Sequence, residues 1–265
     1  MERRPAALPP LFVGVRRVLF FHAHPDDESL STGGLIALLS AAGVKVRVVT
    51  CTRGERGEVV PGPLKRLEGT PELAAHRVGE LTQALRALGV RAPVFLGGPG
   101  ARQLNRGSGF RYLDSGMVWG SDGRAAAAPD APAGSFAGNK WACYDALAAV
   151  KRFRPDVVVS YDSGGGYGHP DHEWAHVAAK QATDNFRLPF VEVVPAEASD
   201  AVEIAIDLEA KRRALAAHAS QLTLTTSGYV LSGGQQHVLE PVERYRLHTG
   251  RRPISPVPAR APTTR

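Results

Sequence analysis

Short apolar runs alternate with helical segments along the first hundred residues, and this alternation limits the chain to one fold class. The apolar runs, rich in residues that favour strands, cover residues 17–22, 45–51 and 94–96. Between them, residues 31–42 and 72–88 have helical character and are each followed by a glycine. The order strand, helix, strand, helix, strand predicts a parallel sheet covered by helices.

The second half of the chain resumes this pattern after a long interruption. Residues 97–138 are rich in glycine, proline, alanine and serine without periodicity, which predicts a long loop region. Helices are then expected at 141–153, 169–186 and 208–219, and strands at 156–161, 191–194, 201–206 and 238–247. Since no repeat or linker interrupts the chain, we predict one α/β domain over residues 1–265.

Composition excludes several classes of protein. A hydrophobic content of 43% is too high for an intrinsically disordered chain, and no apolar run approaches the roughly 20 residues of a membrane span. The N-terminus lacks the apolar region of a secretory signal, so a cytoplasmic location is expected. The only two cysteines, Cys51 and Cys143, cannot build a disulfide framework or a four-cysteine zinc site.

The positive charge of the chain lies at its two ends. Of the formal net charge of +6, residues 1–17 carry +3 and residues 251–265 carry +4, which leaves the intervening chain at −1. Both ends are rich in proline, and we predict that residues 1–16 and 251–265 are flexible tails. We therefore expect neither a nucleic-acid nor a membrane partner; the oligomeric state is left open.

Two polar clusters follow predicted strands and have the composition of a metal site. The sequence His-Pro-Asp-Asp-Glu at 24–28 follows the first strand, and Gly-His-Pro-Asp-His at 168–172 follows the strand at 156–161. Because ligands of open α/β sheets bind at the carboxyl ends of strands, the clusters are expected to converge. His24, Asp27 and His172 then offer two imidazoles and a carboxylate, an open catalytic set for Zn²⁺ that Fe²⁺ also accepts.

The remaining polar residues of the two clusters are candidates for proton transfer. Asp26 is a candidate base for a metal-activated water, and His169 is a candidate for protonating the leaving group or stabilising an oxyanion. Asp171 could hydrogen-bond an imidazole and hold it protonated. Taken alone, each cluster is more often an ordinary turn or helix cap. We expect His22 to be a core or supporting residue, and His176 not to be a ligand.

These segments resemble the zinc-dependent N-acetylglucosaminyl deacetylase family, which is also called LmbE-like or PIG-L-like. The resemblance extends in the expected order through residues 49–58, 77–81, 112–117 and 217–221, and it is strongest to the mycothiol branch. It implies a Rossmann-like domain with a mostly parallel central sheet and helices on both faces. It also implies a hydrolase that removes the acetyl group from an N-acetylglucosaminyl conjugate.

The resemblance assigns roles to individual residues. It makes His24, Asp27 and His172 the zinc ligands and Asp26 the base that activates water. Further roles are oxyanion and leaving-amine assistance by His169, tuning of His169 by Asp171, a mobile oxyanion contact from Tyr167, and sugar binding by Arg77 and Asp114.

The substrate is inferred from segments that depart from the mycothiol pattern. Residues 98–111 and the chain after about residue 225 show no counterpart that we recognise there. Altered loops around an unaltered centre favour a bulky acceptor, so the preferred substrate is a teicoplanin-type glycopeptide-antibiotic pseudoaglycone. The alternatives are a mycothiol-pathway deacetylase acting on GlcNAc-inositol and a mycothiol conjugate amidase. A non-catalytic sugar-binding or metal-storage module would have lost some of these residues, and all are present.

Overall fold

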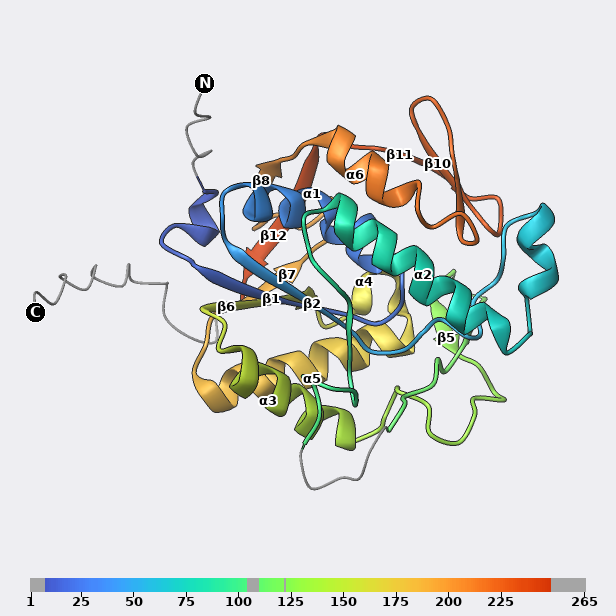
Figure 1. Ribbon diagram of the computed structural model, residues 1–265, viewed down its shortest axis with the longest axis horizontal. Helices are drawn as coiled ribbons and strands as arrows, with labels where there is room; N and C mark the ends of the chain where they lie inside the picture. The colour runs from blue at the N-terminus through green and yellow to red at the C-terminus, as the bar shows by residue number, and fades with distance from the viewer. Residues whose placement is uncertain (1–7, 104–109, 122, 249–265) are drawn as a thin grey trace, which may run out of the picture.

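Seven strands form one central sheet, which two layers of helices enclose (Figure 1). The computed structural model describes residues 8–103, 110–121 and 123–248. From one edge to the other, the strands follow the order β3, β2, β1, β6, β7, β12, β8. Their bounds in that order are Val94–Phe95, Lys45–Thr50, Arg17–His22, Val157–Tyr161, Phe190–Val193, Val242–Leu247 and Val202–Ala205.

Parallel pairing dominates this sheet. Strands β3, β2, β1, β6 and β7 are parallel to one another, whereas β12 is antiparallel to both β7 and β8. In β1, Phe20 lies opposite Val48 of β2 on one side and Val159 of β6 on the other. Such strands are covered on both faces, which explains the continuous apolar run in β1. The predicted α/β class with a mostly parallel sheet is confirmed.

Alternate side chains of β1 pack into two separate cores. Val18 and Phe20 belong to the core beneath α1, α2 and α6, whereas Leu19 and Phe21 belong to the core beneath α3 and α5. These helices span Asp27–Ala41, Glu72–Ala87, Leu208–Leu215, Trp141–Phe153 and Pro170–Phe186, respectively. Figure 1 shows the two helical layers on opposite faces of the sheet.

The order of the strands places a crevice at the carboxyl ends of β1 and β6. From β1 the chain proceeds to β2 through α1, whereas from β6 it proceeds in the opposite direction to β7 through α5. The two crossovers therefore leave the sheet on opposite faces. Open α/β sheets bind their ligands at the point where the strand order reverses in this way, which here lies between β1 and β6. Both polar clusters begin at this point, after His22 and after Tyr161.

Several short elements were not expected from the sequence. Strands β4 (Met117–Trp119) and β5 (Ala125–Ala127) form a hairpin within the predicted loop region. A separate sheet contains β9 (Leu222–Leu224), β10 (Gly228–Leu231) and β11 (Gln236–Val238). The short helices are the 3-10 turns Pro10–Phe12 and Pro63–Leu67 and the helical turn α4 at Gly165–Gly168.

Several predicted boundaries differ from the structure, and the helix expected at 31–42 begins four residues earlier, at Asp27. The strand expected at 238–247 is divided between β11 and β12, since Pro241 lies between them and lacks an N–H for a ladder. The helix expected at 208–219 ends at Leu215. Within the predicted N-terminal tail, Phe12 and Val15 are buried in the core under α1 and α2. The other predicted tail, residues 251–265, lies outside the described residues.

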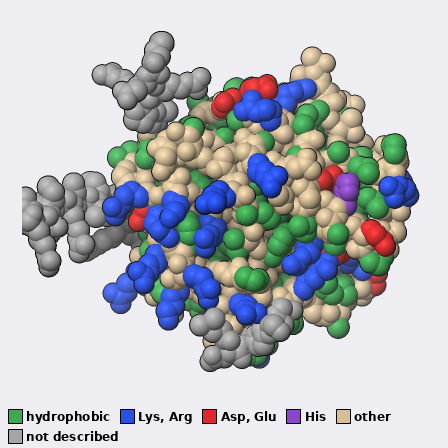
Figure 2. Space-filling model, in the orientation of Figure 1, with side chains coloured by type: hydrophobic (Ala, Val, Ile, Leu, Met, Phe, Trp, Pro, Cys, Tyr) green, Lys and Arg blue, Asp and Glu red, His purple; other side chains and the backbone are tan. Residues whose placement is uncertain are grey.

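Basic side chains are unevenly distributed over the described surface. Figure 2 shows Lys and Arg gathered over the left and lower left of the visible face, near α3. At the end of α3, the guanidinium groups of Arg17 and Arg47 each lie 4.6 Å from the centre of the Phe153 ring. Among the described helices, none combines the length and the apolar character that crossing a membrane requires.

Candidate active site

The first polar cluster forms a tight turn between β1 and α1. The His24 N–H donates to Asp27 Oδ2 at 2.8 Å, which fixes the carboxylate over the start of α1. Asp26, between them, has a φ of 116°, a conformation that residues other than glycine rarely adopt. Its own N–H donates to Glu28 Oε2 at 3.1 Å. The turn therefore directs two successive carboxylates into different parts of the site.

The second polar cluster enters α5 through a glycine-rich turn. Gly165, Gly166 and Gly168 all have positive φ values, which the turn requires and which glycine adopts without strain. His169 is the N-cap of α5, and its Nδ1 accepts a hydrogen bond from the Asp171 N–H at 3.1 Å. His172 lies in the first turn of the helix, where its Nδ1 is 3.2 Å from the Gly165 carbonyl oxygen. Its Nε2 is consequently free to face the first cluster.

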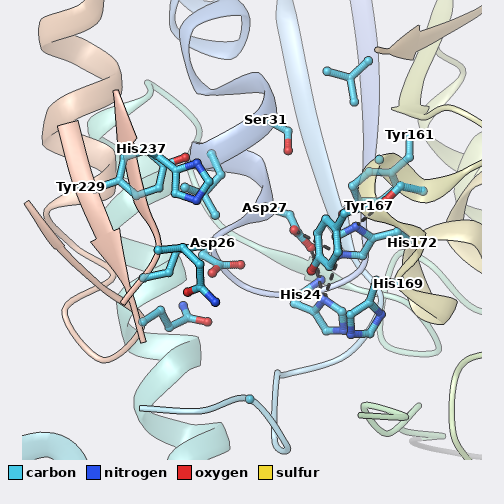
Figure 3. Close-up of a pocket in the computed structure, with 18 of the residues that line it drawn as sticks. His24, Asp26, Asp27, Ser31, Tyr161, Tyr167, His169, His172, Tyr229 and His237 are labelled. Atoms are coloured by element: carbon cyan, nitrogen blue, oxygen red, sulfur yellow. Dashed lines mark hydrogen bonds and ion pairs between the residues drawn. The ribbon is translucent and has the colours of Figure 1, made fainter. Parts of the chain in front are cut away.

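The three predicted ligands lie together (Figure 3). His172 Nε2 is 3.3 Å from His24 Nδ1 and 3.3 Å from Asp27 Oδ1, and His24 Nδ1 is 3.4 Å from Asp27 Oδ2. Four ligands around Zn²⁺ at 2.0–2.1 Å are separated by about 3.3–3.4 Å, the edge of the tetrahedron. The three side chains place two imidazole nitrogens and one carboxylate within reach of a single divalent cation, with Asp27 Oδ1 toward His172 and Oδ2 toward His24.

Two other groupings of donors lie nearby, and both share His24. Nitrogen atoms of His24, His169 and His172 lie within 4.8 Å of one another, as do donors of His24, Asp114 and Asp171. We favour the set with Asp27, because Nδ1 of His169 accepts a hydrogen bond at the helix cap. The second grouping faces the other nitrogen of His24, since Nε2 is 3.1 Å from Asp171 Oδ2 and 3.7 Å from Asp114 Oδ1.

Asp171 contacts the predicted ligand His24 through its carboxylate. Besides His24, this buried group accepts hydrogen bonds from the N–H and the hydroxyl of Ser115 and from the Ala137 N–H. A carboxylate behind a metal-binding histidine is the usual arrangement that orients the ring. The Asp171 carboxylate binds His24, and its charge also raises the pKa of His169 against the larger lowering effect of burial, so the tuning of His169 by Asp171 stays a prediction.

Neighbouring charges shift the pKa values of the carboxylates. Burial raises the pKa of Asp27, but His172 and His24 outweigh it and hold this pKa well below its usual range. For Asp26, burial and then the Asp27 carboxylate raise the pKa to about 8, against the opposing effects of His218 and Arg77. A carboxyl group with a pKa near neutrality suits proton transfer.

The pKa values of His24 and His169 are shifted in opposite directions. Burial lowers the pKa of His24, but the carboxylates of Asp114, Asp171 and Asp27 outweigh it and raise this pKa well above its usual value. Burial, with the charges of His24 and His172, lowers the pKa of His169 to about 2. His169 is therefore neutral, and because its Nδ1 accepts a hydrogen bond, it carries its proton on Nε2.

Arg77, Asp114 and Tyr167 all line the same pocket. Arg77 is buried, and its guanidinium donates to the carbonyl oxygens of Gly54 at 2.5 Å and Glu58 at 2.8 Å. Tyr167 is 46% exposed, and its ring meets that of His172 edge to face with centres 5.2 Å apart. Arg77 thus holds the loop that borders the pocket, while Tyr167 lies over the metal ligands.

The pocket itself extends well beyond the metal ligands. Its volume is about 920 Å³, and it continues from His24 and His172 past Asp26 to residues of β10 and β11. In Figure 3, His169, His172 and Tyr167 lie on one side of Asp26, and Tyr229 and His237 lie on the other. The pocket therefore has a metal end and an aromatic end.

Sequence reasoning missed several residues that shape the site. The Tyr161 ring stacks on His172 with centres 4.2 Å apart, and its hydroxyl accepts the Ala23 N–H at 2.9 Å. Glu28 and His218 form a fully buried ion pair at 2.8 Å behind Asp26. His218 lies in the segment at 217–221 that carried part of the resemblance, and this was the available signal.

The other two histidines singled out from the sequence are not at the metal end. His22 is buried, and its Nε2 is 2.9 Å from the Thr32 hydroxyl, in agreement with a supporting role. His176 Nδ1 lies 2.9 Å from the Tyr161 carbonyl oxygen and 3.8 Å from Glu192. Neither histidine belongs to a group of potential metal ligands among the described residues.

Comparison with known proteins agrees with this geometry. The sequence profile of the family "PIG-L: GlcNAc-PI de-N-acetylase" matches residues 19–183, more than half of the chain. The chain belongs to the PIG-L family. This membership confirms the resemblance noted from the sequence motifs and the prediction that the protein is a deacetylase enzyme, a hydrolase acting on an amide bond.

Two relatives of this PIG-L family member are similar along most of their length. Both are 1D-myo-inositol 2-acetamido-2-deoxy-alpha-D-glucopyranoside deacetylases. The protein from Saccharopolyspora erythraea is 38% identical, over 88% of this chain and 90% of its own. The protein from Actinosynnema mirum is 40% identical, over 88% of this chain and 92% of its own.

The solved structures support the fold. The deacetylase of the teicoplanin biosynthetic pathway, in complex with bog, matches 89% of this chain and all of its own chain with a TM-score of 0.56. The sequence identity is 20%, so this similarity supports the fold and says nothing about the substrate.

The preferred substrate predicted from the sequence, a glycopeptide-antibiotic pseudoaglycone, is wrong. Both relatives carry the name of GlcNAc-inositol deacetylases, which matches the stated alternative. Alignments that cover 88% of the chain must include residues after 225, where we had recognised no counterpart. The prediction failed because surface loops diverge without a change of substrate, so the differences in loop sequence did not indicate a different acceptor.

Proposed function

We propose that this protein removes the N-acetyl group from 1D-myo-inositol 2-acetamido-2-deoxy-α-D-glucopyranoside, hereafter GlcNAc-inositol. The observation that carries the proposal is the triangle of His24, Asp27 and His172 at the carboxyl ends of β1 and β6. The names of the two relatives, which are similar over most of their length, support the substrate.

These three side chains would hold a divalent cation, and we propose Zn²⁺. Two imidazoles and one carboxylate are a donor set that Zn²⁺ accepts with positions left open for water and substrate, and Fe²⁺ accepts the same set. When bound, the cation supplies a Lewis acid that polarises a carbonyl group and lowers the pKa of water.

We propose that Asp26 accepts the proton of the attacking water. Asp26 lines the same pocket as the proposed ligands His24, Asp27 and His172, where its carboxylate can accept a proton from water and pass it on. The turn that contains Asp26 also contains Asp27, so the base and the metal ligand are held by one short segment. The returned proton would go to the departing amine.

Neutral His169 would stabilise the tetrahedral oxyanion as a hydrogen-bond donor. Its Nδ1 is occupied by the Asp171 N–H, which leaves Nε2–H for the substrate. The Tyr167 hydroxyl is a second donor of this kind, because burial and the nearby carboxylates raise its pKa and keep it protonated. Arg77 and Asp114 would contribute to sugar binding from the walls of the pocket.

Acetate release from GlcNAc-inositol tests the proposal directly. We expect release by the purified protein, its loss after treatment with a chelator, and its recovery after Zn²⁺ is restored. If a teicoplanin-type pseudoaglycone is deacetylated and GlcNAc-inositol is not, the proposed substrate is wrong. If activity is unchanged without metal, the proposed chemistry is wrong.

The absence of nucleic-acid and membrane partners and the cytoplasmic location stay predictions. The relatives' named substrate is a small glycoconjugate, which is consistent with a pocket rather than an extended binding surface.

A further inference from the structure

A stacked pair of rings forms the wall of the pocket at the end away from the metal ligands. Tyr229 on β10 and His237 on β11 occupy paired positions, and their rings are 5.1 Å apart with an angle of 14° between the planes. Both residues line the pocket that contains His24 and Asp26. The pair therefore lies within the enclosure that would receive the substrate, yet it makes no contribution to the chemistry described above.

Tyr229 and the proposed base Asp26 line the same pocket. Burial, followed by the charge of Asp26, raises the pKa of the Tyr229 hydroxyl to about 12. Figure 3 shows the Tyr229 and His237 rings across the pocket from His169 and His172, with Asp26 between the two groups. A substrate whose acetamido group is at the metal end would consequently direct its other end toward these rings.

Polar side chains surround the ring pair. Ser232 and Gln235, in the turn between β10 and β11, line the pocket beside the rings. The Ser232 hydroxyl donates to Glu58 Oε2 at 3.3 Å, which connects this turn to the loop held by Arg77. An apolar ring face with hydrogen-bonding groups at its border suits a polyhydroxylated ring, which has apolar C–H faces and polar edges.

We propose that Tyr229 and His237 form the subsite for the second ring of the substrate, the cyclitol or sugar linked to the anomeric carbon of GlcNAc. This inference rests on the proposed function and adds specificity-determining residues to it. The acetamido ring would occupy the metal end of the pocket, and the linked ring would pack on the aromatic pair. The pocket volume of about 920 Å³ accommodates more than one ring.

The test compares two substrates, GlcNAc-inositol and free N-acetylglucosamine, which lacks the second ring. For Tyr229→Ala, we expect KM for GlcNAc-inositol to rise about fivefold to tenfold with kcat unchanged, since one ring contact is lost. Neither constant for free N-acetylglucosamine should change. A change of the same size for both substrates, or for neither, would overturn the inference.

Two further variants separate ring packing from other effects. Tyr229→Phe keeps the ring, so KM for GlcNAc-inositol should stay within about twofold of wild type. A rise in KM as large as that of Tyr229→Ala would show that the hydroxyl, not the ring, acts on the substrate, and would overturn the inference.

His237→Ala replaces an exposed residue and should also raise KM for GlcNAc-inositol. An unchanged KM in His237→Ala would remove His237 from the subsite.

A control variant is available on the other side of the molecule. Tyr144 is 46% exposed on α3, outside the pocket, and Tyr144→Ala should leave all four constants unchanged. Acetate release by the wild-type protein distinguishes a failure of the proposed function from a failure of the aromatic subsite. If it releases acetate from neither substrate, the proposed function fails; if it cleaves both and Tyr229→Ala behaves as wild type, only the aromatic subsite fails.

Discussion

At the scale of single residues, the site depends on one strained position. Asp26 has a positive φ, which costs a non-glycine residue on the order of 1–3 kcal/mol. Its N–H is bound by Glu28, and the carboxylate of Glu28 is held in turn by His218 and the Ser29 hydroxyl. These buried contacts keep the conformation that separates the directions of Asp26 and Asp27.

We expect Asp26→Ala and His172→Ala to differ in metal content. Asp26→Ala should retain the cation and lose about 10²–10⁴-fold in kcat, the usual contribution of a general base. His172→Ala should lose both the cation and activity, because a ligand is removed. Metal analysis of the purified variants and acetate release check this prediction. Near wild-type turnover by Asp26→Ala would contradict the assignment of the base.

The strain at Asp26 has a separate test in stability. Asp26→Gly should be about 1 kcal/mol more stable than Asp26→Ala, since glycine adopts a positive φ without strain. Urea denaturation of both variants measures the difference. Equal stability would show that the backbone at this position is not strained.

The buried pair of Glu28 and His218 should stabilise the fold in a pH-dependent way. His218→Ala leaves Glu28 buried without its partner, which costs about 3–5 kcal/mol in the free energy of unfolding. His218→Gln, which retains a donor, should lose less. Denaturation of wild type and both variants by urea provides the measurement.

The pH dependence follows from the direction of the shift in the pKa of His218. Burial lowers this pKa, but Glu28 outweighs burial and raises it above 6.5. A raised folded-state pKa stabilises the fold fully below the unfolded-state value, and the contribution is lost as the pH rises through the folded-state pKa. The difference between wild type and His218→Ala should therefore be larger at about pH 6 than at about pH 9. A difference that grows with pH would contradict this assignment.

At the scale of elements, different parts of the fold form the two ends of the pocket. Strands β1 and β6 and the helices that follow them hold the metal end, whereas β10 and β11 provide the aromatic end. These two parts differ in support: β1 is covered on both faces, but the three-stranded sheet of β9, β10 and β11 is separate from the central sheet. Changes in the hairpin should therefore affect binding before they affect the core.

Gly228→Ala tests this division. A Cβ at Gly228 would lie 1.8 Å from the His237 carbonyl oxygen, so β10 and β11 must move apart and the ring pair must separate. We expect a rise in KM for GlcNAc-inositol and a loss of about 1–3 kcal/mol in the free energy of unfolding.

Gly79→Ala is the matched control on an exposed face of α2. No atom lies within 4 Å of its added Cβ, and the substitution should stabilise the helix by about 0.5–1 kcal/mol without a change in KM. Equal effects of the two substitutions on KM would show that β10 and β11 play no part in substrate binding.

At the scale of the whole molecule, the bound cation would connect segments that are distant in the chain. His24 and Asp27 follow β1, and His172 lies about 145 residues later at the start of α5. A ligand that binds only the folded state stabilises it, by about 2.7 kcal/mol when its concentration is a hundredfold above Kd. The cation should therefore contribute to stability as well as to chemistry.

Removal of the metal should lower both activity and Tm. We expect a chelator to abolish acetate release and to reduce Tm, and we expect Zn²⁺ to restore both. Differential scanning calorimetry with parallel activity assays makes the comparison, and His172→Ala, which lacks a ligand, should show no response of Tm to Zn²⁺. A wild-type Tm that is independent of metal would contradict a site at the junction of β1 and β6.

The sequence predicted the regular elements better than the short ones. The bounds expected for β1 and α3 agree with the structure, because both segments have a clear apolar pattern. Strands β4, β5, β9 and β11 have only three residues each, too few for a periodic signal. Pairing with a neighbouring strand, rather than local preference, stabilises them.

In the candidate site, too, some features follow from the sequence and others only from the tertiary structure. By itself, the sequence determined the order of strands and helices, the two polar clusters and the family, since these depend on local pattern and on residue type. Only the tertiary structure decided which nitrogen of His24 faces Asp27 and His172, that neutral His169 donates from Nε2, and that Tyr229 and His237 close the pocket. The physical reason is that these features arise from contacts between segments far apart in the chain, whose orientation is set only when the two cores pack against the sheet.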